Sequence, residues 1–463
     1  KLAGGVLLLL VASAAAGRFD AGRSAVLATE LEAIGLSSAS IKAEATTMGE
    51  WIVALRRRLH KTPELMYDLT ETAAIVREVL DELKIPYKYP VASHGIVATI
   101  GSGKQPVIAL RSDMDALPVN EEVMEGTADF VSQRPGKMHA CGHDAHMAML
   151  LAAAKLLKAR EKTLTGTVQL VFQPAEEGGA GGLAMLLEGV SDSTDKVKRI
   201  FGMHVWPWLP TGSFGMKSGP IMAGAGSFEV VVKGKGGHAA AGVGMGVVDP
   251  TVAVAAAITS LQSIVAREVA PTDQAVVSVT MIHGGDAYNV VPAQVTFGGT
   301  LRAFSRTTYD LIERRTKEII QHTAAAHGCD VDMFFTSFAD DCLKTTGLPG
   351  AFASGCTYPP VVNDNDMFFL SHGAATSLVG AEFVKEATAT MGGEDFAYFA
   401  EKVPANFVYL GIGNAAKNTT VGLHSPSFKL DEDALALGAA LHVTTALHAL
   451  HDLGGLSTAK FEL

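Results

Sequence analysis

Apolar residues recur at helical spacing between Met48 and Leu83, and Pro63 divides this stretch into two predicted helices. Three short β-rich runs follow, and each ends in polar residues: PVIALRSDMD, TVQLVFQPAEE and KRIFGMHVWP. A strong helical pattern, AHMAMLLAAAKLLKAR, and a weaker one, GLAMLLEGV, lie between them. This alternation predicts an α/β fold with a largely parallel sheet, in which ligands bind beyond the carboxyl ends of the strands.

A second set of elements begins after about Met222. Its β-rich runs are SFEVVVKGKGGHAA, AVVSVTMIHGG, QVTFGGTLRAF and VDMFFTSFA, and its helical patterns are DPTVAVAAAITSLQSIVARE and the stretch from Thr308 to Ala326. These runs predict a compact α+β insert, in which the second and third strands can pair as a hairpin. Beyond the insert, FVYLGIG and an Ala-rich helix resume the first pattern.

The length of the chain supports this division, because 463 residues exceed the roughly 250–300 at which a single core stops growing. We expect one domain formed by residues 46–222 and 359–463, an inserted domain over 223–339, and a linker or insertion over 340–358. With 48% hydrophobic and 18% charged residues, the composition excludes a disordered chain. The formal net charge of −11 and the lack of a long basic stripe argue against a nucleic-acid partner.

Three features bear on the compartment of the protein. Residues 1–17 combine a basic residue, a short apolar stretch and small residues, which is typical of a signal-peptide remnant and too short for a membrane span of about 20 residues; a buried apolar helix is the alternative. Residues 460–463, KFEL, have the shape of an endoplasmic-reticulum retrieval signal with Phe where Asp is usual. Asn418 begins a glycosylation sequon. We expect the secretory pathway and the endoplasmic-reticulum lumen.

Four cysteines are too few to form a disulfide framework for so long a chain. Cys342 and Cys356 flank a Gly/Pro-containing stretch and could pair in an oxidising lumen. Cys141 stands between histidines, in the densest cluster of metal-binding residue types, HACGHDAH over 139–146. Residues two apart in an extended segment project to one side, so Cys141 and His143 can reach one ion, while Asp144 is placed to cap the following helix. Thiolate and imidazole suit zinc and other transition metals.

The cluster leaves alternatives open. It could be a polar loop with surface histidines, and His139 and His146 could be outer-shell or merely structural. A thiol dyad of Cys141 and His143 also remains possible, since Cys and His make nucleophile pairs. The sequence contains no G-x-S-x-G elbow and no Walker motif, so competing hydrolytic and phosphate-binding chemistries are poorly supported.

A pair of carboxylates, Glu176 and Glu177, follows the strand run TVQLVFQ. Adjacent side chains at a strand end point in different directions, so one can bind a metal while the other faces the water that the metal polarises. An exposed acidic turn is the alternative. Further candidate ligands next to apolar runs are Asp113, Asp115, His204, His424 and the pair Glu394-Asp395, although a lone histidine in such a place is often a core residue, and the acidic pair could equally start a helix.

The motifs together resemble peptidase family M20, in the amidohydrolase branch that includes hippurate hydrolases and plant auxin-conjugate hydrolases. The resemblance covers about residues 48 to 450 and is carried by LRRRLHKTPEL, LRSDMDALPV, MHACGHDAHMAMLLAAA, VFQPAEEGGAGG, GMHVWP, GKGGHAA, HGGDAYNVVP, MGGEDFAYF and LHSPSF. It implies a largely parallel-sheet catalytic domain with an inserted α+β lid domain at 223–339. The stretch from Asp340 to Thr357 is longer than the family pattern, and GKGGHAAAGVGMG lacks the polar continuation common after that motif.

The resemblance also implies a site. It assigns two divalent metal ions, with manganese as first choice and zinc or cobalt as alternatives, and Glu176 as general base beside an orienting Asp115. The implied metal ligands are Cys141, His143, Glu177, His204 and His424. It further suggests that His238, Asn289 and Arg302 of the lid meet the substrate.

The expected function is a metal-dependent amidohydrolase that cleaves N-acyl amino acids, in first place indole-3-acetyl-amino-acid conjugates. General aminoacylase, hippurate hydrolase or dipeptidase activity is the alternative among enzymes. A noncatalytic metal-dependent binder of N-acyl amino acids is the alternative from another class, but it would be expected to lack the base or a ligand. The edge of the lid domain could either form a homodimer or remain exposed to solvent.

Overall fold

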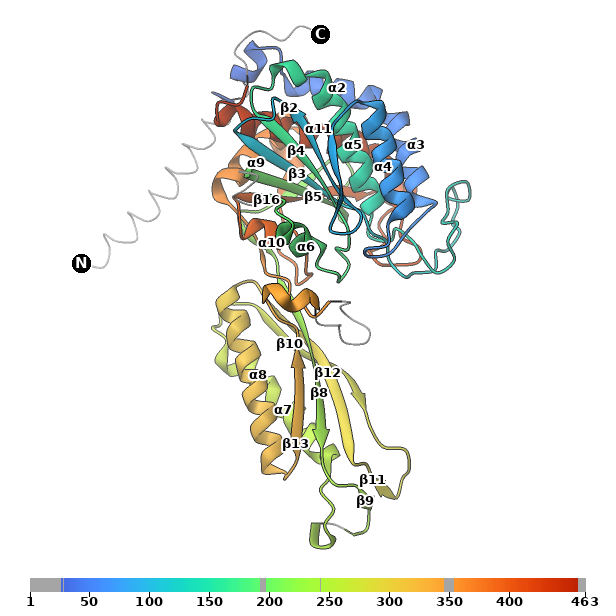
Figure 1. The fold of residues 1–463 in the computed structure, drawn as a ribbon, viewed down its shortest axis with the longest axis vertical. Coiled ribbons are helices and arrows are strands. Elements are labelled where there is room, and N and C mark those ends of the chain that lie inside the picture. The colour runs from blue at the N-terminus through green and yellow to red at the C-terminus, as the bar shows by residue number, and fades with distance from the viewer. Residues whose placement is uncertain (1–25, 28, 192–196, 242, 345–353, 457–463) are drawn as a thin grey trace, which may run out of the picture.

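A mixed eight-stranded sheet forms the centre of the larger of two domains in the computed structural model (Figure 1). The structure describes residues 26–456 except 28, 192–196, 242 and 345–353, so the segments 1–17 and 460–463 lie outside the described residues. The strand order is β1-β2-β4-β3-β5-β16-β6-β15. The strands are Tyr87–Val91 (β1), Gly95–Gly101 (β2), Val107–Asp113 (β3), Thr167–Gln173 (β4), Val197–Pro210 (β5), Phe214–Met216 (β6), Val384–Glu386 (β15) and Ala405–Gly413 (β16).

The middle of this sheet is parallel, as the alternation of strands and helices predicts. Strand β3 pairs in parallel with β4 and β5, and β16 pairs in parallel with β5. The edges depart from that pattern, because β1 and β2 form an antiparallel hairpin that continues onto β4. The turn of the hairpin has positive φ at Ala92 and Ser93. Tight hairpin turns usually place Gly, Asn or Asp at such positions, so the residues Ala92 and Ser93 do not predict a hairpin.

Helices cover both faces of the large sheet and enclose separate cores. Helices α3 and α4 lie on either side of Pro63, where the sequence predicts them, and α5 and α11 are buried along most of their length. The helices of this domain are Ser38–Thr47 (α2), Gly49–His60 (α3), Thr70–Glu82 (α4), His143–Ala159 (α5), Gly181–Leu187 (α6), Asn365–Val379 (α9), Ala397–Ala400 (α10) and Leu435–Asp452 (α11). A short pair, Gly219–Met222 (β7) with Val361–Asn363 (β14), lies where the chain leaves and re-enters the domain.

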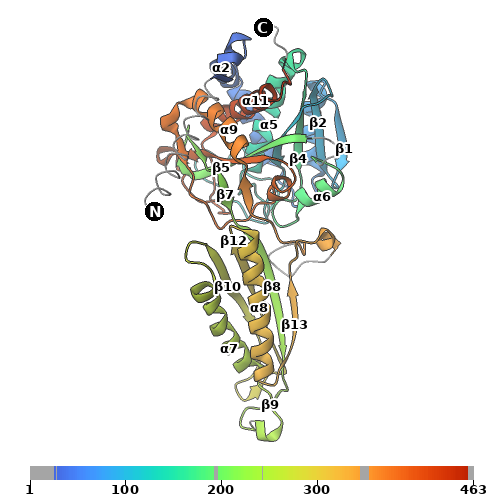
Figure 2. The ribbon, with the colours of Figure 1, turned by 90° about the vertical axis from the view of Figure 1, so that its left-hand side faces the viewer.

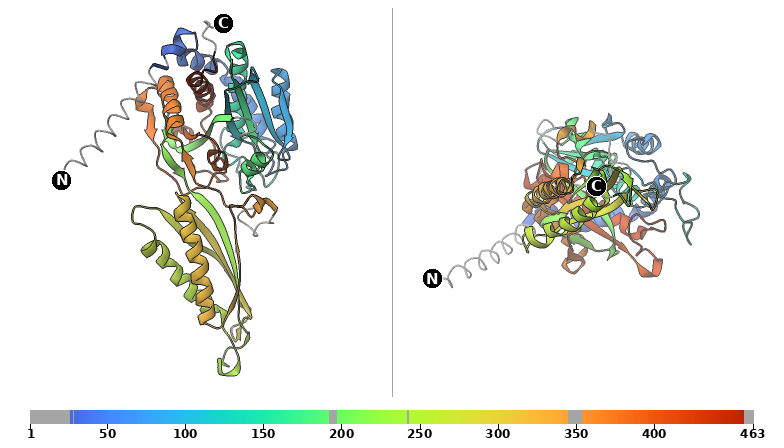
Figure 3. Two further views of the ribbon diagram at one scale, coloured as in Figure 1. Left: turned by 60° about the vertical axis from the view of Figure 1, so that its left-hand side comes forward. Right: turned by 90° about the horizontal axis from the view of Figure 1, so that it is seen from below.

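The lid is an elongated α+β domain below the catalytic domain (Figures 1 and 2). Its four-stranded sheet has the order β10-β12-β8-β13, and two long helices pack on one face of it (Figure 3). The predicted hairpin of the second and third strands is confirmed, because β10 pairs antiparallel with β12. The elements are Gly224–Lys233 (β8), Pro250–Ser263 (α7), Ala275–His283 (β10), Gln294–Ala303 (β12), Arg306–Ala326 (α8) and Asp330–Phe335 (β13), with the pair Gly237–His238 (β9) and Val290–Val291 (β11) at the distal end.

Two helices of the described chain are long and apolar enough to cross a bilayer, as judged by length and composition alone: Pro250–Glu268 and Glu432–Asp452. The second is mostly buried in the catalytic domain. The first contains α7, which packs against α8 and the lid sheet. Helices that form the core of a domain in this way are weak evidence for a membrane span.

Candidate metal centre

The predicted ligands gather where the central parallel strands end. Asp113 is the last residue of β3, Glu176 and Glu177 follow β4, and His204 lies in β5, which is adjacent to β3. Because the carboxyl ends of parallel strands meet at one edge of a sheet, strands far apart in sequence deliver these side chains to one place. Cys141 joins them, with its Sγ 3.3 Å from His204 Nε2.

The segment that carries Cys141 and His143 is not extended, contrary to the sequence interpretation. Helix α5 begins at His143, and Gly142 before it has φ 88°. A Cβ atom at Gly142 would lie 2.5 Å from Cγ2 of Val205, so both the backbone conformation and the close approach to β5 favour glycine. The two ligands therefore come together through a left-handed turn into a helix rather than through strand alternation.

Asp144 does not cap α5, which corrects a second expectation. The N-cap residue is Gly142, with no side-chain capping bond, and Asp144 lies inside the first turn. Its Oδ2 forms an ion pair with Arg56, 2.8 Å from Nε, and lies 2.7 Å from His60 Nδ1. The carboxylate thus ties α3 to the start of α5, next to the ligand His143.

The two buried candidate ligands His143 and His204 are oriented by backbone carbonyl groups. His143 Nδ1 donates to the carbonyl oxygen of Asp115 at 2.7 Å, and His204 Nδ1 donates to the carbonyl oxygen of Val205 at 2.7 Å. A carbonyl can only accept, so each Nδ1 carries a proton and each Nε2 faces the cluster. Burial lowers the pKa of His204 well below its ordinary value, which keeps that ring neutral, as metal ligation requires.

The carboxylate of Glu177 and its histidine neighbours lie too far apart to hydrogen-bond to one another well, but close enough to bind a shared cation. Glu177 Oε1 lies 3.5 Å from His424 Nε2 and 3.8 Å from His143 Nε2. Glu177 Oε1 and His143 Nε2 are both buried, and neither has a hydrogen-bond partner in the described chain. Five sets of candidate ligand atoms lie within 4.8 Å of one another in the described part of the chain, and two of them share Cys141: Cys141 with His143 and His204, and Cys141 with Glu177 and His424. A thiol shared by two such sets suits a pair of neighbouring metal ions.

His424 reaches the cluster from the rim, and its side chain is 54% exposed. Its φ is 63°, and its backbone N–H donates to the carbonyl oxygen of Ala140 at 2.8 Å. This contact joins the loop of His424 to the segment that carries Cys141. The left-handed backbone is uncommon for a residue other than glycine and is typical of functional positions held by their surroundings.

Glu176 lines the cavity, and within the part of the chain that the structure describes no basic side chain is bonded to its carboxyl. Burial raises the pKa of its carboxyl well above the ordinary range, and the negative charges of Glu394 and Glu177 add to the effect. A nearby cation opposes this shift and favours the carboxylate, so the group can take and return a proton. Asp115 holds the loop, because its two carboxylate oxygens accept from the backbone N–H groups of Glu176 at 2.9 Å and Glu177 at 3.1 Å.

Asp113 is occupied by protein groups. Its Oδ1 lies 2.6 Å from His146 Nδ1, and its Oδ2 lies 2.7 Å from Arg111. His146 Nε2 in turn accepts from the backbone N–H of Val205 at 2.9 Å, so this histidine supports β5. His139 is buried, and burial lowers its pKa to about 3. These three residues therefore line the back of the site rather than its cavity.

Glu394 and Asp395 are held by Arg111, a residue that the sequence interpretation missed. The Arg111 guanidinium is buried and contacts Glu394 at 2.9 Å, Asp395 at 3.1 Å and Asp113 at 2.7 Å. An arginine inside the apolar run PVIALRSDMD was the available signal, because a buried cation requires anionic partners. The acidic pair therefore belongs to this ion-pair network. Its carboxylates also lie within 4.8 Å of that of Glu176, and Glu394 lines the cavity, so a place in the metal site stays a prediction.

A cavity of about 740 Å³ opens over these ligands. Its floor contains Cys141, Glu176, Glu177, His204 and His424. Its walls are largely apolar and aromatic: Met66, Leu117, Pro118, Trp206, Trp208, Met222, Tyr358 and Leu423. A mostly apolar cleft with a few convergent polar groups is the usual form of a small-molecule site.

Of the three lid candidates, Arg302 in β12 lines this cavity, and its NH1 donates to the carbonyl oxygen of Met391 at 2.9 Å. His238 and Asn289 do not line it. His238 lies in β9, at the distal end of the lid (Figure 2). The side chains of His238 and Asn289 are both exposed. Within one chain, the structure therefore brings Arg302 to the ligand cluster and leaves His238 and Asn289 away from it.

Comparison with known proteins adds three findings. The model of peptidase family M20/M25/M40 matches residues 109–448. The chain is 41% identical to the IAA-amino acid hydrolase ILR1-like 2 of Arabidopsis thaliana, over 87% of this chain and 86% of that protein, and 36% identical to the N-acetylcysteine deacetylase of Bacillus subtilis, over 87% and 97%. A solved dinuclear metal-binding peptidase of the M20 family from Bacillus subtilis has a TM-score of 0.71 at 33% identity, over 88% of this chain and 99% of that one.

Proposed function

This chain belongs to the M20/M25/M40 peptidase family, and on that premise we propose that it is a metal-dependent amidohydrolase that releases amino acids from N-acyl conjugates, in first place indole-3-acetyl-amino acids. The observation that carries the proposal is that Glu176, to which no basic side chain of the described residues is bonded, lines the same cavity as Cys141, the residue shared by two ligand sets. The relatives named for amide-cleaving activities support hydrolysis over binding alone.

Two divalent cations are the proposed cofactor, because the neighbouring structure of the family is a dinuclear metal-binding peptidase and the donor sets here fit such a pair. Cys141, His143 and His204 would hold one ion, and Cys141, Glu177 and His424 the other. Bound there, divalent cations polarise an amide carbonyl and lower the pKa of a water molecule. Manganese is our first choice, and zinc and cobalt also suit this mixed N/O/S set.

Glu176 is the proposed general base. Its carboxylate accepts a proton from the attacking water and returns it to the nitrogen of the departing amino acid. The backbone of Glu176 is fixed by Asp115, so its carboxylate has a defined position over the cavity floor. Arg302 faces the same cavity with a cationic group, and it is the proposed partner of the substrate carboxylate.

Trp208 supports an aromatic acyl group. Trp206 stacks on Tyr409 with centroids 4.1 Å apart and planes 8° apart, and Trp208 packs against Trp206 at 4.8 Å. Trp208 is 59% exposed and lines the cavity, so it can offer a ring to a ligand. An indole-3-acetyl group would extend this series of rings, since aromatic pairs add about 0.5–1.5 kcal/mol beyond burial of area.

Replacing Trp208 with Ala tests the acyl group. We expect kcat/KM for indole-3-acetyl-alanine to fall about 10-fold, which corresponds to 1.4 kcal/mol, because the stacked ring is lost. Cleavage of acetyl-methionine should change less than about twofold, since a small acyl group does not reach the ring. Initial rates on both substrates, with hippurate and a dipeptide added, give the ratio. Equal losses on the aromatic and acetyl substrates would contradict an aromatic acyl site and favour a general aminoacylase.

Cys141→Ser tests the shared ligand. We expect the purified variant to hold about half of the wild-type manganese or less, because a hydroxyl is a much weaker ligand than a thiolate. Cys329→Ser is the matched control, since Cys329 is also a buried free cysteine but lies in the lid. Elemental analysis of metal-saturated, desalted protein measures the effect. Full metal content in the Cys141 variant would remove this residue from the ligand set.

We also propose that the protein resides in the secretory pathway, in the endoplasmic-reticulum lumen. The disulfide between Cys342 and Cys356 supports an oxidising compartment, and Asn418 of the sequon is exposed. A homodimer through the lid is a further proposal. Exposed apolar side chains on β10 and just beyond it, among them Met281, Ile282 and Tyr288, support it.

A further inference from the structure

The loop that carries Glu176 and Glu177, here called the base loop (residues 174–181), has an unfavourable backbone. Ala175 and Ala180 have φ of 54° and 55°, in the left-handed region that side chains rarely adopt, and Gly178 has φ 101°. Such conformations persist only where the surrounding structure over-determines them. The base loop therefore depends on contacts from outside itself.

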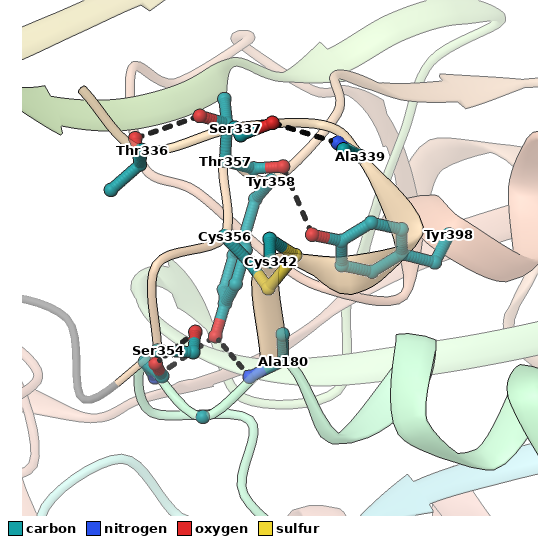
Figure 4. Close-up of a disulfide and its surroundings, with 12 residues drawn as sticks. Ala180, Thr336, Ser337, Ala339, Cys342, Ser354, Cys356, Thr357, Tyr358 and Tyr398 are labelled. Carbon is teal, nitrogen blue, oxygen red and sulfur yellow. Dashed lines mark hydrogen bonds between the residues drawn. A yellow bond between two sulfur atoms is a disulfide. The ribbon is translucent and has the colours of Figure 1, made fainter. Parts of the chain in front are cut away.

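Tyr358 supplies three of these contacts through one oxygen (Figure 4). Its hydroxyl accepts hydrogen bonds from the backbone N–H groups of Gly178 and Ala180, both at 3.0 Å, and donates to the carbonyl oxygen of Glu176 at 2.7 Å. A tyrosine hydroxyl has one donor and two acceptor positions, and these three bonds match them. Burial raises the pKa of Tyr358 well above its ordinary value, so the hydroxyl keeps the proton that it donates.

The segment that presents Tyr358, residues 354–358, is held by a disulfide. Cys356 lies between Ser354 and Tyr358 and is bonded to Cys342 (Figure 4). Ser354 adds two more bonds to the base loop, because its backbone N–H and its Oγ both donate to the carbonyl oxygen of Gly178, at 3.1 Å and 2.9 Å. The residues on both sides of Cys356 thus hold the loop of the proposed base.

The opposite side of this segment is bonded to the lid. Tyr358 and Ala225 exchange two backbone hydrogen bonds of 2.9 Å, and the backbone N–H of Thr357 donates to the carbonyl oxygen of Ser337 at 2.8 Å. Ala225 lies in β8, and Ser337 follows β13, which is the edge strand that pairs with β8. The segment therefore lies between the root of the lid and the base loop, with hydrogen bonds to both.

We propose that Tyr358 is a positioning residue that fixes the carboxylate of Glu176 through the backbone of the base loop, and that the Cys342–Cys356 disulfide holds the segment that presents it. The proposal rests on the proposed role of Glu176 as general base. The hydroxyl of Tyr358 contacts main-chain atoms of the base loop, so Tyr358 affects the position of the Glu176 carboxylate. Removal of the Tyr358 hydroxyl should therefore reduce turnover, while metal binding and substrate affinity are largely retained.

Tyr358→Phe removes the hydroxyl and keeps the ring. We expect kcat on the best amide substrate to fall about 10- to 100-fold, because a misplacement of about 1 Å at a reacting group costs up to about 100-fold. KM should stay within about threefold, and metal content should not change. Tyr398→Phe is the matched control, since its hydroxyl is also buried and donates to the carbonyl oxygen of Thr357 at 2.9 Å without touching the base loop. We expect a change of less than about threefold there.

Hydrogen exchange of the base loop gives a readout that does not need activity. The backbone N–H groups of Gly178 and Ala180 should exchange faster in Tyr358→Phe than in wild type, with no such change in Tyr398→Phe, because the hydroxyl of Tyr358, unlike that of Tyr398, accepts from them. If the wild-type protein cleaves no amide, the proposed function fails while the exchange result still decides on the contact. Ser354→Ala, a milder variant, should raise exchange in the same peptide.

The replacement of both Cys342 and Cys356 by Ala tests the second half of the proposal. We expect faster exchange of the base loop and a fall in kcat of about threefold or more, because the segment is then held by hydrogen bonds alone. Unchanged kcat and exchange in this variant would overturn the role of the disulfide. A Tyr358→Phe protein with wild-type kcat and exchange, or a Tyr398→Phe protein that loses as much kcat, would overturn the role of Tyr358.

Discussion

Glu176→Gln is expected to reduce kcat about 100- to 10,000-fold while leaving the metal content of the protein unchanged. The amide has nearly the shape of the carboxylate but cannot accept a proton from water at neutral pH. The proposed ligand sets share Cys141 and do not include Glu176, so its replacement should not release an ion, even though its carboxylate also lies within 4.8 Å of ligand atoms of His143 and Glu177. Steady-state rates on an N-acyl amino acid, with elemental analysis of the same preparation, measure both effects.

Glu177→Gln is the matched control for this prediction, because it makes the same chemical change at the neighbouring residue. Glu177 Oε1 faces His424 and His143, so its variant should lose metal as well as activity. The two variants therefore separate a base from a ligand. A Glu176→Gln protein with wild-type turnover would remove the proposed base, and one that loses metal would move Glu176 into the ligand set.

The sequence predicted the place of the site better than its local geometry. Short β-rich runs that end in polar residues located β3, β4 and β5, and these strands deliver acidic or imidazole side chains to one edge. The proximity of Cys141 and His143 was predicted, but the left-handed turn at Gly142 that brings them together was not. Strand periodicity carries no information about a left-handed glycine such as Gly142, because that conformation is set by the close approach of β5.

Contacts between distant segments were the part that the sequence did not reveal. Tyr358 and Glu176 are 182 residues apart, and nothing in either local pattern links them. The partners of Arg111 are equally remote, since Glu394 lies 283 residues away. Such pairings depend on tertiary packing, and a buried charge inside an apolar strand shows only that some partner exists. The resemblance to the family supplied His204 and His424 as ligands, where residue patterns alone favoured a core role for a single histidine.

Arg111→Met is expected to lower the free energy of unfolding by about 3–5 kcal/mol, because it leaves buried carboxylates without their cation. Arg111 is the shared partner of Asp113, Glu394 and Asp395, and all four side chains are buried. The loss should depend on pH. Burial already raises the pKa of Asp395 to about 8, and Arg111 opposes that shift. Urea unfolding of metal-free protein, followed by circular dichroism, measures the change.

The direction of the pH dependence follows from protons bound in each state. An unfolded Asp titrates near about 3.9, whereas folded Asp395 holds its proton to higher pH, so folding takes up a proton between these values. The stability of the variant should therefore fall as pH rises from about 4 towards 8 and beyond, and the deficit relative to wild type should be larger at pH 8 than at pH 5. Arg58→Met, at an exposed ion pair with Glu78, should cost less than about 1 kcal/mol at either pH. Equal and pH-independent losses in the two variants would show that Arg111 contributes packing alone and does not stabilise the carboxylates behind the site.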